Sequence, residues 1–389
     1  MSSTSQSLRA LLNNADTVAA LEGIYERQLQ RILSTLADGL TSAGAARARE
    51  LLAELRILVH ELDPSRDSLV RQWIRENIPA AFVLGDEAAT LQLQKELGQV
   101  SDADAEDFGA LRSGFTAVNQ TAMRAITSMM EETLKNAAAD IQNTLGLAVR
   151  RTQLTLQTDA AIREAVIGGR VRGATGKQLA DDIANVILQG GDPKALARLQ
   201  ELGFQPDLLQ LYKRLAEGQF ITINGRNYNV SSYAKMVART MMSEAHKSGT
   251  IVRLQQNGVD HVKWEEHAQK EPDSCTLFMG NVFYIGAGED PLGFPSLSTV
   301  PNHGVPQHPN CVCTLAAWVI QFKTKPMVDA ARAIADALPD DVFGKTAREV
   351  ADYVDQLTPA QFEEIAPRGA ANLPDDYFQG PPPSKSAAA

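Results

Sequence analysis

The sequence has few cysteines and no long apolar run, and each shortage excludes a class of protein. Three cysteines among 389 residues are too few, and odd in number, for a disulfide scaffold. All apolar runs are shorter than the roughly 18 residues that a membrane helix needs. The polar residues 1–7 lack the charged and apolar regions of a signal peptide. We therefore expect a soluble protein made in a reducing cytoplasm.

Positive charge is also in short supply. The chain has 37 Lys and Arg against 47 Asp and Glu, which gives a formal net charge of −10 at pH 7. An acidic chain is repelled at long range by nucleic acid and by anionic membranes. Broad electrostatic capture of either is therefore not expected, and any such contact would need a local basic spot.

Aromatic residues make up only 6% of the chain, whereas Ala, Leu, Gln and Glu are abundant. The abundant residues favour helices, and 389 residues exceed the usual size of one hydrophobic core. We expect an α-rich, α+β protein with two or three cores. It would have an N-terminal helical bundle with long helices, a small α+β module and a short helical C-terminal tail.

The first 155 residues show apolar positions at three- and four-residue spacing, which predicts amphipathic helices. One helix is expected over about 7–40 with a break near Asn13, and another around 51–59. Pro79 removes a backbone donor and is expected to bend or stop a third helix, and residues 80–94 are expected to continue as helix. A long pattern over 108–155 predicts one extended helix of a bundle or coiled-coil arm. We assign this N-terminal region to docking and assembly.

Residues 156–256 form a second region with shorter predicted helices and one hairpin. Two helices are expected within 161–189. The Asn224-Gly225 pair predicts a tight hairpin over 220–230, because both turn positions need positive φ. Ser231 or Ser232 would then cap a helix that ends near Gln256.

A local basic patch lies beside the glycines of this region. It consists of Arg163, Arg170, Arg172 and Lys177. A phosphate-binding loop is one interpretation, but no strand is expected before it and the spacing differs from a P-loop. A solvated surface is the other interpretation.

Residues 257–320 are expected to form the small α+β module. Its predicted strands are His261–Trp264, Val282–Ile285 and Val312–Ile320. Residues 321–389 would form three short helices and a disordered tail. The helices are expected at about 328–338 and 347–356 and after the cap Thr358, with the tail at 381–389.

All three cysteines lie in or next to this module, which indicates one local site. They are Cys275, Cys311 and Cys313, with His308 close by in the run 308–313. If Cys311 and Cys313 start a strand, their side chains share one face, because the period of a strand is two. A Cys3His set would then satisfy a tetrahedral structural zinc ion.

Three other interpretations of these residues remain open. The cysteines would pack as small hydrophobes while His308 bonds a loop carbonyl. Alternatively, Cys275 would act as a nucleophile with His267 and Asp273, which would make the protein an enzyme. A disulfide between Cys311 and Cys313 is disfavoured, because so small a ring is strained.

Several motifs occur in an order that resembles the phage Mu F-like head-morphogenesis proteins. They are Ala238-Arg239-Thr240 with Ser243 and Ala245, Asn257-Gly258-Val259, the strand to Trp264, Asp273-Ser274-Cys275, Gly280-Asn281-Val282-Phe283, and His308-Pro309-Asn310-Cys311-Val312-Cys313. The hairpin Asn224-Gly225-Arg226 and the segment 233–240 are also similar to a related group of phage minor capsid proteins. The resemblance covers roughly residues 160–320.

The chain departs from the family pattern at two places. Many members have C-x2-C where this chain has Cys275-Thr276-Leu277-Phe278, and many have Arg at the position of Val312. The first difference removes a sulfur from the predicted metal site. Phe278 is instead expected to pack against that corner of the module.

The resemblance implies a non-enzymatic minor head protein of a tailed phage or prophage. Such a protein acts in head morphogenesis, is associated with the portal and stays in small copy number inside the virion, after assembly in the host cytoplasm. Major capsid and scaffold proteins are further expected partners. One alternative is an effector enzyme that is carried in the head and uses Cys275 and His267. Another is a packaging or ejection factor that contacts DNA through the basic patch. The resemblance implies no catalytic residues.

Overall fold

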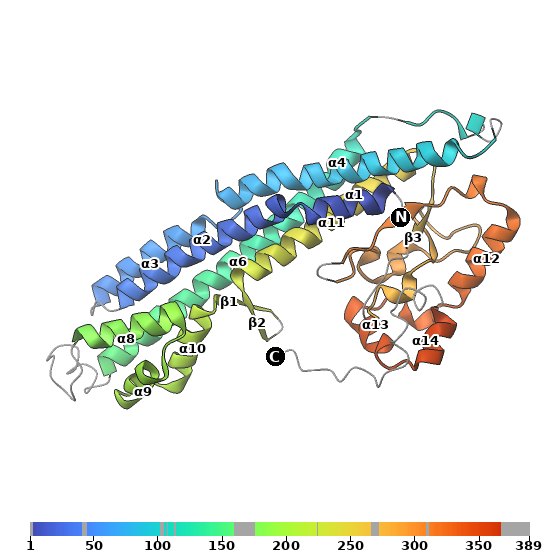
Figure 1. Cartoon of the computed structure of the whole chain (residues 1–389). Helices are drawn as coiled ribbons and strands as arrows, with labels where there is room; N and C mark the ends of the chain where they lie inside the picture. Colours follow the sequence, from blue (N-terminus) through green and yellow to red (C-terminus); the bar gives the residue numbers. More distant parts are fainter. Residues whose placement is uncertain are drawn as a thin grey trace. The chain divides into compact units, whose positions relative to one another are not determined.

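A computed structural model describes residues 3–40, 45–101, 105–106, 108–112, 114–158, 176–223, 225–265, 272–308 and 311–366 (Figure 1). The fold is α-rich with two small sheets, as predicted. The chain divides into two compact units. Unit 1 comprises Met1–Asn14, Asn77–Ile126 and Arg239–Ala389, and unit 2 comprises Ala15–Glu76 and Thr127–Ala238.

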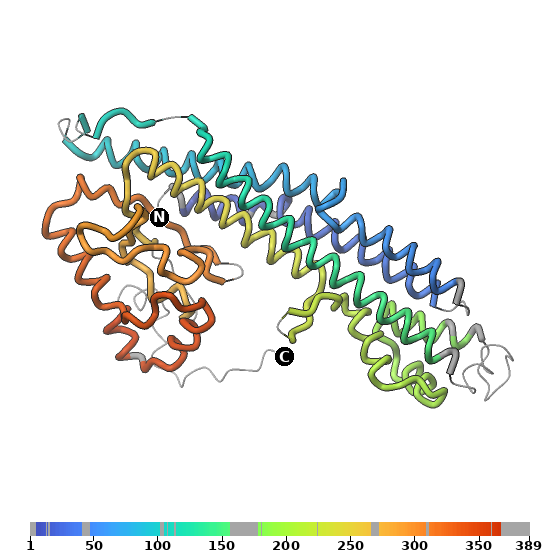
Figure 2. Tube along the Cα trace, turned by 180° about the vertical axis from the view of Figure 1, so that it is seen from behind, coloured from blue at the N-terminus to red at the C-terminus, as the bar shows by residue number. Residues whose placement is uncertain are grey.

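Unit 2 consists of helices and one hairpin. Its elements are α2 (Ala15–Leu40), α3 (Ala45–His60), the start of α4 (Leu69–Leu97), most of α6 (Ala117–Thr158), α8 (Gly176–Gln189), α9 (Pro193–Glu201), α10 (Pro206–Ala216), β1 (Gln219–Ile223), β2 (Arg226–Asn229) and the start of α11 (Val230–Gln256). The helices α2 and α3 lie side by side, and α8 packs on both α2 and α10 (Figures 1 and 2). The strands β1 and β2 pair antiparallel, which confirms the predicted hairpin.

Unit 1 combines helices with a three-stranded antiparallel sheet in the order β4-β3-β5. Its elements are α1 (Ser3–Asn13), the rest of α4 and α11, the start of α6, β3 (His261–Trp264), the 3-10 turn η2 (Thr276–Phe278), β4 (Val282–Tyr284), β5 (Leu315–Ala317), α12 (Lys325–Asp336), α13 (Ala347–Val354) and α14 (Pro359–Ile365). One core contains residues from the sheet, from the cysteine turns and from the C-terminal helices. At its centre Trp264 stacks on Phe278 with the ring centroids 5.4 Å apart, so the predicted packing of Phe278 is confirmed.

Several predicted boundaries agree with these elements. The break near Asn13 separates α1 from α2. Thr358 caps α14 through a reciprocal bond with Gln361. The tail after residue 366 and the first helix expected within 161–189 lie outside the described residues.

Pro79 lies inside α4 and does not stop it, and residues 80–94 continue as helix, as expected. Ile78 and Phe82 on either side are fully buried, and their packing holds the helix across the missing hydrogen bond. Two predicted helix starts are wrong in detail. The long helix begins at Ala117, nine residues later than expected, where Thr116 and Asn119 bond each other at the new terminus.

The second correction concerns the start of α11. The helix begins at Val230, before the predicted caps Ser231 and Ser232. The side chain of Asn229 accepts hydrogen bonds from both of their backbone N–H groups, at 3.0 and 3.2 Å. Asn229 is therefore the residue that caps α11, since its oxygen satisfies donors that have no partner within the helix.

A buried ion pair connects three helices within unit 1. Arg253 of α11 donates to Asp86 of α4 over 2.5 Å, and both side chains are less than one tenth exposed. The other oxygen of Asp86 accepts from Asn119 of α6 at 3.1 Å, and Asn119 in turn accepts from Gln256 at 2.5 Å. A buried charge is tolerated only when it is paired and hydrogen-bonded, so this network fixes the register of the three helices.

His246 is a buried titratable group on α11. Its Nε2 lies 3.3 Å from the hydroxyl of Ser7, and burial lowers its pKa from 6.5 to about 4. A depressed pKa in the folded state means that the unfolded chain takes up the proton first as pH falls. Stability that is complete above pH 6.5 is therefore lost as the pH falls toward 4.

We expect this histidine to make the protein about 2 kcal/mol less stable at pH 5 than at pH 8. Urea unfolding at several pH values measures the effect. In the His246→Gln variant, the difference in unfolding free energy between pH 8 and pH 5 should be smaller by that amount. The comparison uses this difference and not the absolute stability, so a general cost of the substitution does not matter. An unchanged difference in the variant would show that His246 is not the group responsible.

Among the described helices, none combines the length and the apolar character that a membrane crossing requires.

Candidate metal centre

The first cysteine is held by an aspartate turn in unit 1. Asp273 accepts a hydrogen bond from the backbone N–H of Cys275 at 2.8 Å. Its own N–H donates to the hydroxyl of Thr276 at 2.8 Å, and η2 follows directly. An aspartate that bonds the backbone two residues later closes a compact turn, which fixes where the Cys275 sulfur points.

The second part of the site comes from the turn before β5. The N–H of Cys311 donates to the carbonyl of His308 at 3.1 Å, so these two residues lie close together. The strand expected over Val312–Ile320 is shorter, because only Leu315–Ala317 pair with β3. Cys311 and Cys313 precede that strand, so strand alternation does not place them. Both are nevertheless buried.

Three of the four predicted ligands come together in space. The sulfurs of Cys275 and Cys311 are 3.6 Å apart, and the ligand atoms of Cys275, His308 and Cys311 all lie within 4.8 Å of one another. The two cysteines are 0% and 2% exposed. Cys313 is not in this group, although it lies within hydrogen-bonding reach of both other sulfurs.

An aspartate that was not among the predicted ligands orients the histidine. Asp273 Oδ2 lies 3.0 Å from His308 Nε2, and each side chain is 34% exposed. Burial alone would lower the pKa of His308, but the bonds to Asp273 and Cys311 outweigh it and raise the pKa to about 10. Histidine ligands of metals commonly bond a carboxylate through their second ring nitrogen. Asp273 was predicted only as a partner of a nucleophile, and its position two residues before Cys275 was the available signal.

The three thiols differ in acidity. Burial raises the pKa of Cys275 and the pKa of Cys313. Hydrogen bonds from Cys275 and Cys313, with the nearby His308, lower the pKa of Cys311. Of the three thiols, Cys311 is therefore the one that loses its proton most readily, beside His308.

These donors can hold a metal ion. Two sulfurs and one imidazole nitrogen are ligands that soft or borderline ions such as Zn²⁺ prefer. The lowered pKa of Cys311 favours the deprotonated sulfur that a metal ion binds. Cys313 is placed to provide a third sulfur and so a fourth ligand, and the carboxylate of Asp273 holds the imidazole of His308.

The other predicted functional residues are only partly described. His267, the proposed base for Cys275, lies outside the described residues, and so do Arg163, Arg170 and Arg172. Lys177 is in α8, but its side chain is not described.

Comparisons with family models, with curated proteins and with solved structures found no match.

Proposed function

We propose that the chain is a non-enzymatic minor head protein of a tailed phage or prophage, which acts in head morphogenesis beside the portal. The observation that carries the proposal is the convergence of the family-like motifs. Residues from four of these motifs belong to one buried core of unit 1, although they are up to 49 positions apart. They are Trp264, Cys275, Phe283, Cys311 and Cys313.

The burial of the sulfurs favours a structural role over a catalytic one. The three cysteines are between 0% and 2% exposed, whereas a nucleophile must reach its substrate from a cleft. The small cavity that Cys313 lines with Ser243 and His246 has a volume of only about 10 Å³, which is room for one water molecule at most. The cluster is therefore suited to hold two turns together.

We further propose that the ion held by this cluster is one structural zinc, with Cys275, His308, Cys311 and Cys313 as its ligands. A zinc ion would balance the negative charge of its thiolate ligands and would link these ligands to one another. Cys275 belongs to the turn before η2 and the other three ligands belong to the turn before β5. Joining them would fix two loops of the module that no strand pairing holds. Asp273 would keep the imidazole of His308 in its orientation.

The partners follow from the same proposal. The long helices within residues 1–155 would contact the portal and the major capsid or scaffold proteins, and packaged DNA would be at most a local contact. The protein would reside in the interior of the virion after assembly in the host cytoplasm.

The test is the composition of phage particles made with and without the intact gene. Quantitative mass spectrometry of purified particles should find the chain at low copy number together with the portal, and deletion of the gene should reduce the yield of filled heads. A major tail protein present in both samples serves as the internal standard. If the chain is missing from purified particles while the portal is present, the proposal is wrong.

A further inference from the structure

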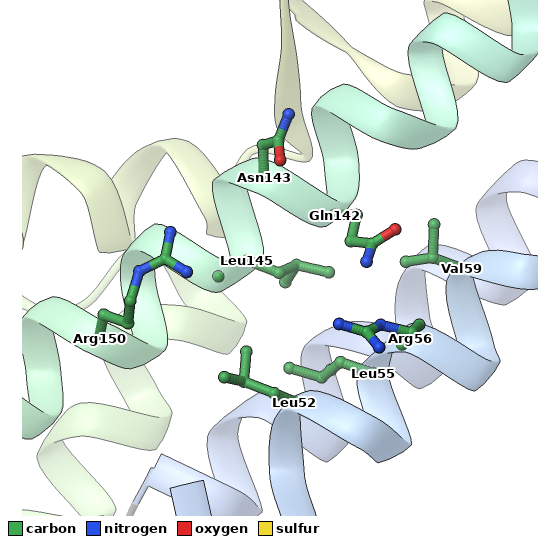
Figure 3. Close-up of a pocket in the computed structure, with 9 residues that line it drawn as sticks. Leu52, Leu55, Arg56, Val59, Gln142, Asn143, Leu145 and Arg150 are labelled. Atoms are coloured by element: carbon green, nitrogen blue, oxygen red, sulfur yellow. The ribbon is translucent and has the colours of Figure 1, made fainter. Parts of the chain in front are cut away.

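A polar hollow of about 210 Å³ lies between α3 and α6 within unit 2 (Figure 3). Leu55 and Leu145, which line it, are only 2% and 1% exposed, so its accessible side chains are mainly polar ones such as Arg56, Gln142 and Arg150. None of the described residues that line it carries a thiol, an imidazole or a carboxylate. Reactive side chains gather instead in the cysteine cluster of unit 1, which offers a chemistry besides metal binding.

The sulfurs of Cys275 and Cys311 are in contact at 3.6 Å, although 36 positions separate the two residues in the chain. Both cysteines are free thiols in the structure. A disulfide bond is about 2.05 Å long, so the two atoms need to approach by roughly 1.5 Å. Cys275 precedes η2 and Cys311 precedes β5, and neither lies in a helix or a strand. The two side chains can therefore approach without breaking the backbone pairing of the sheet.

Cys275 and Cys311 are also the best matched of the possible pairs. A bond between Cys311 and Cys313 would close a ring across one intervening residue, which strains it. Cys313 lies within hydrogen-bonding reach of both other sulfurs, but Cys311 is the sulfur that groups with Cys275 and His308 within 4.8 Å. Cys313 would therefore remain a free thiol beside the bond.

The burial of the pair restricts which oxidant can reach it. The two cysteines are 0% and 2% exposed, and the cluster meets solvent at His308 and Asp273, whose side chains are each 34% exposed. The cavity that Cys313 lines has a volume of about 10 Å³, which is room for one water-sized molecule. Hydrogen peroxide is close to that size, whereas glutathione disulfide is many times larger. A small peroxide is therefore the oxidant that fits.

We propose that Cys275 and Cys311 are a redox pair, which hydrogen peroxide converts to an intramolecular disulfide when no metal ion is bound. Peroxide first transfers one oxygen to one of the thiols, which becomes a sulfenic acid while one water molecule leaves. The second thiol then attacks this sulfur. The S–S bond forms, the S–O bond breaks, and the hydroxyl leaves with the thiol proton as a second water. Two electrons pass from the two sulfurs to one peroxide, and an excess of thiol reverses the reaction by exchange.

The disulfide would join the same two turns that the proposed zinc ion would join. The two states exclude each other, because a sulfur in a disulfide is no longer the thiolate that a metal binds. Peroxide would thus replace a metal link by a covalent one at the same place in unit 1. The inference concerns the cluster of the proposed zinc ion, but it needs only the contact between the sulfurs, so it can fail or succeed separately from the metal and from the head assignment.

The experiment uses the full-length chain, either stripped of metal by a chelator or supplied with zinc. Each sample is treated with hydrogen peroxide, alkylated to block the remaining thiols and digested without reductant, and mass spectrometry identifies cross-linked peptides. In the metal-free chain we expect two of the three thiols to be lost, one cross-link from Cys275 to Cys311, and recovery of all thiols with dithiothreitol. Glutathione disulfide at the same concentration should react on the order of tenfold more slowly, because access limits thiol exchange.

Two variants show which sulfurs take part. Cys313→Ala is the matched control, since it removes a buried thiol of the same core and leaves the pair intact, so the cross-link should still form. In Cys275→Ala no intramolecular disulfide should form, and peroxide should carry Cys311 on to the sulfinic acid. Circular dichroism checks that each variant is folded, and the wild-type cross-link decides the question if a variant is not.

The proposal is overturned by thiols that peroxide leaves unchanged, by a cross-link to Cys313, by links between two chains only, or by sulfinic acid without a cross-link in the wild type. Zinc at about ten times its dissociation constant should slow the cross-linking about tenfold, because only the ion-free fraction reacts. A cross-link whose rate does not depend on zinc would contradict the zinc site and support the redox pair. A chain that binds zinc but forms no cross-link after the metal is removed would do the reverse.

Discussion

Replacing Cys311 with alanine is expected to release about one zinc ion per chain and to destabilise unit 1 by more than about 3 kcal/mol. Structural zinc contributes on the order of 10 kcal/mol to domains with no other core. Unit 1 has a core of its own, so the loss should be smaller but still above the usual cost of a point mutation. Elemental analysis and thermal unfolding measure the two effects.

The same variant separates zinc binding from simple packing of thiols. If the cysteines only pack as small hydrophobes, alanine at position 311 should be tolerated better than serine, and a chelator should leave the wild type unchanged. If a metal is bound, Cys311→Ala and Cys311→Ser should be equally damaging, and a chelator should lower the stability of the wild type alone. Ala317→Ser, at another buried position of the same core, controls for adding a hydroxyl. A folded wild type that contains no metal after expression with zinc would disprove the site.

Replacing Gly85 or Gly249 with alanine is expected to cost more than about 3 kcal/mol, because α4 and α11 approach each other closely within unit 1. A Cβ at Gly85 would lie 1.9 Å from the carbonyl oxygen of His246, and a Cβ at Gly249 would lie 2.1 Å from the carbonyl oxygen of Phe82. Both obstacles are backbone atoms, which can move only by separating the helices. Overpacking of this kind typically costs 1–3 kcal/mol and more where nothing can yield. Urea unfolding measures the loss.

A third glycine supplies the control. Gly23 lies within α2, and a Cβ there would meet only the end of the Arg27 side chain at 3.2 Å. Alanine is about 1 kcal/mol better than glycine inside a helix, so Gly23→Ala should be neutral or slightly stabilising. Similar losses at all three positions would mean that helix contact is not the cause.

The sequence predicts best where the determining atoms are close together in the chain. The Asn224-Gly225 pair, the cap at Thr358 and the break at Asn13 are local signals, and each is found at or next to the expected residue. The grouping of Cys275 with His308 and Cys311 was also predicted, from the short spacing between His308 and Cys311 and from the position of all three cysteines in one small module.

What could not be predicted depends on residues that are far apart in the sequence. Asp86 and Arg253 are 167 positions apart, and no periodicity indicates that they meet. The role of Asp273 beside His308 likewise arises only when separate segments pack.

Unit 1 is built from three separate segments of the chain, so the ribosome finishes unit 2 before it finishes unit 1. Unit 2 ends at Ala238, whereas the last segment of unit 1 is Arg239–Ala389. The core of unit 1 joins Leu93 to Phe362, so about 270 residues must be translated between these two partners. At 5–20 residues per second this takes on the order of 10 to 50 seconds. During that interval Ala89 and Leu93 lack the apolar surface that covers them in the finished protein, and a chain that terminates early exposes them permanently to chaperones and proteases.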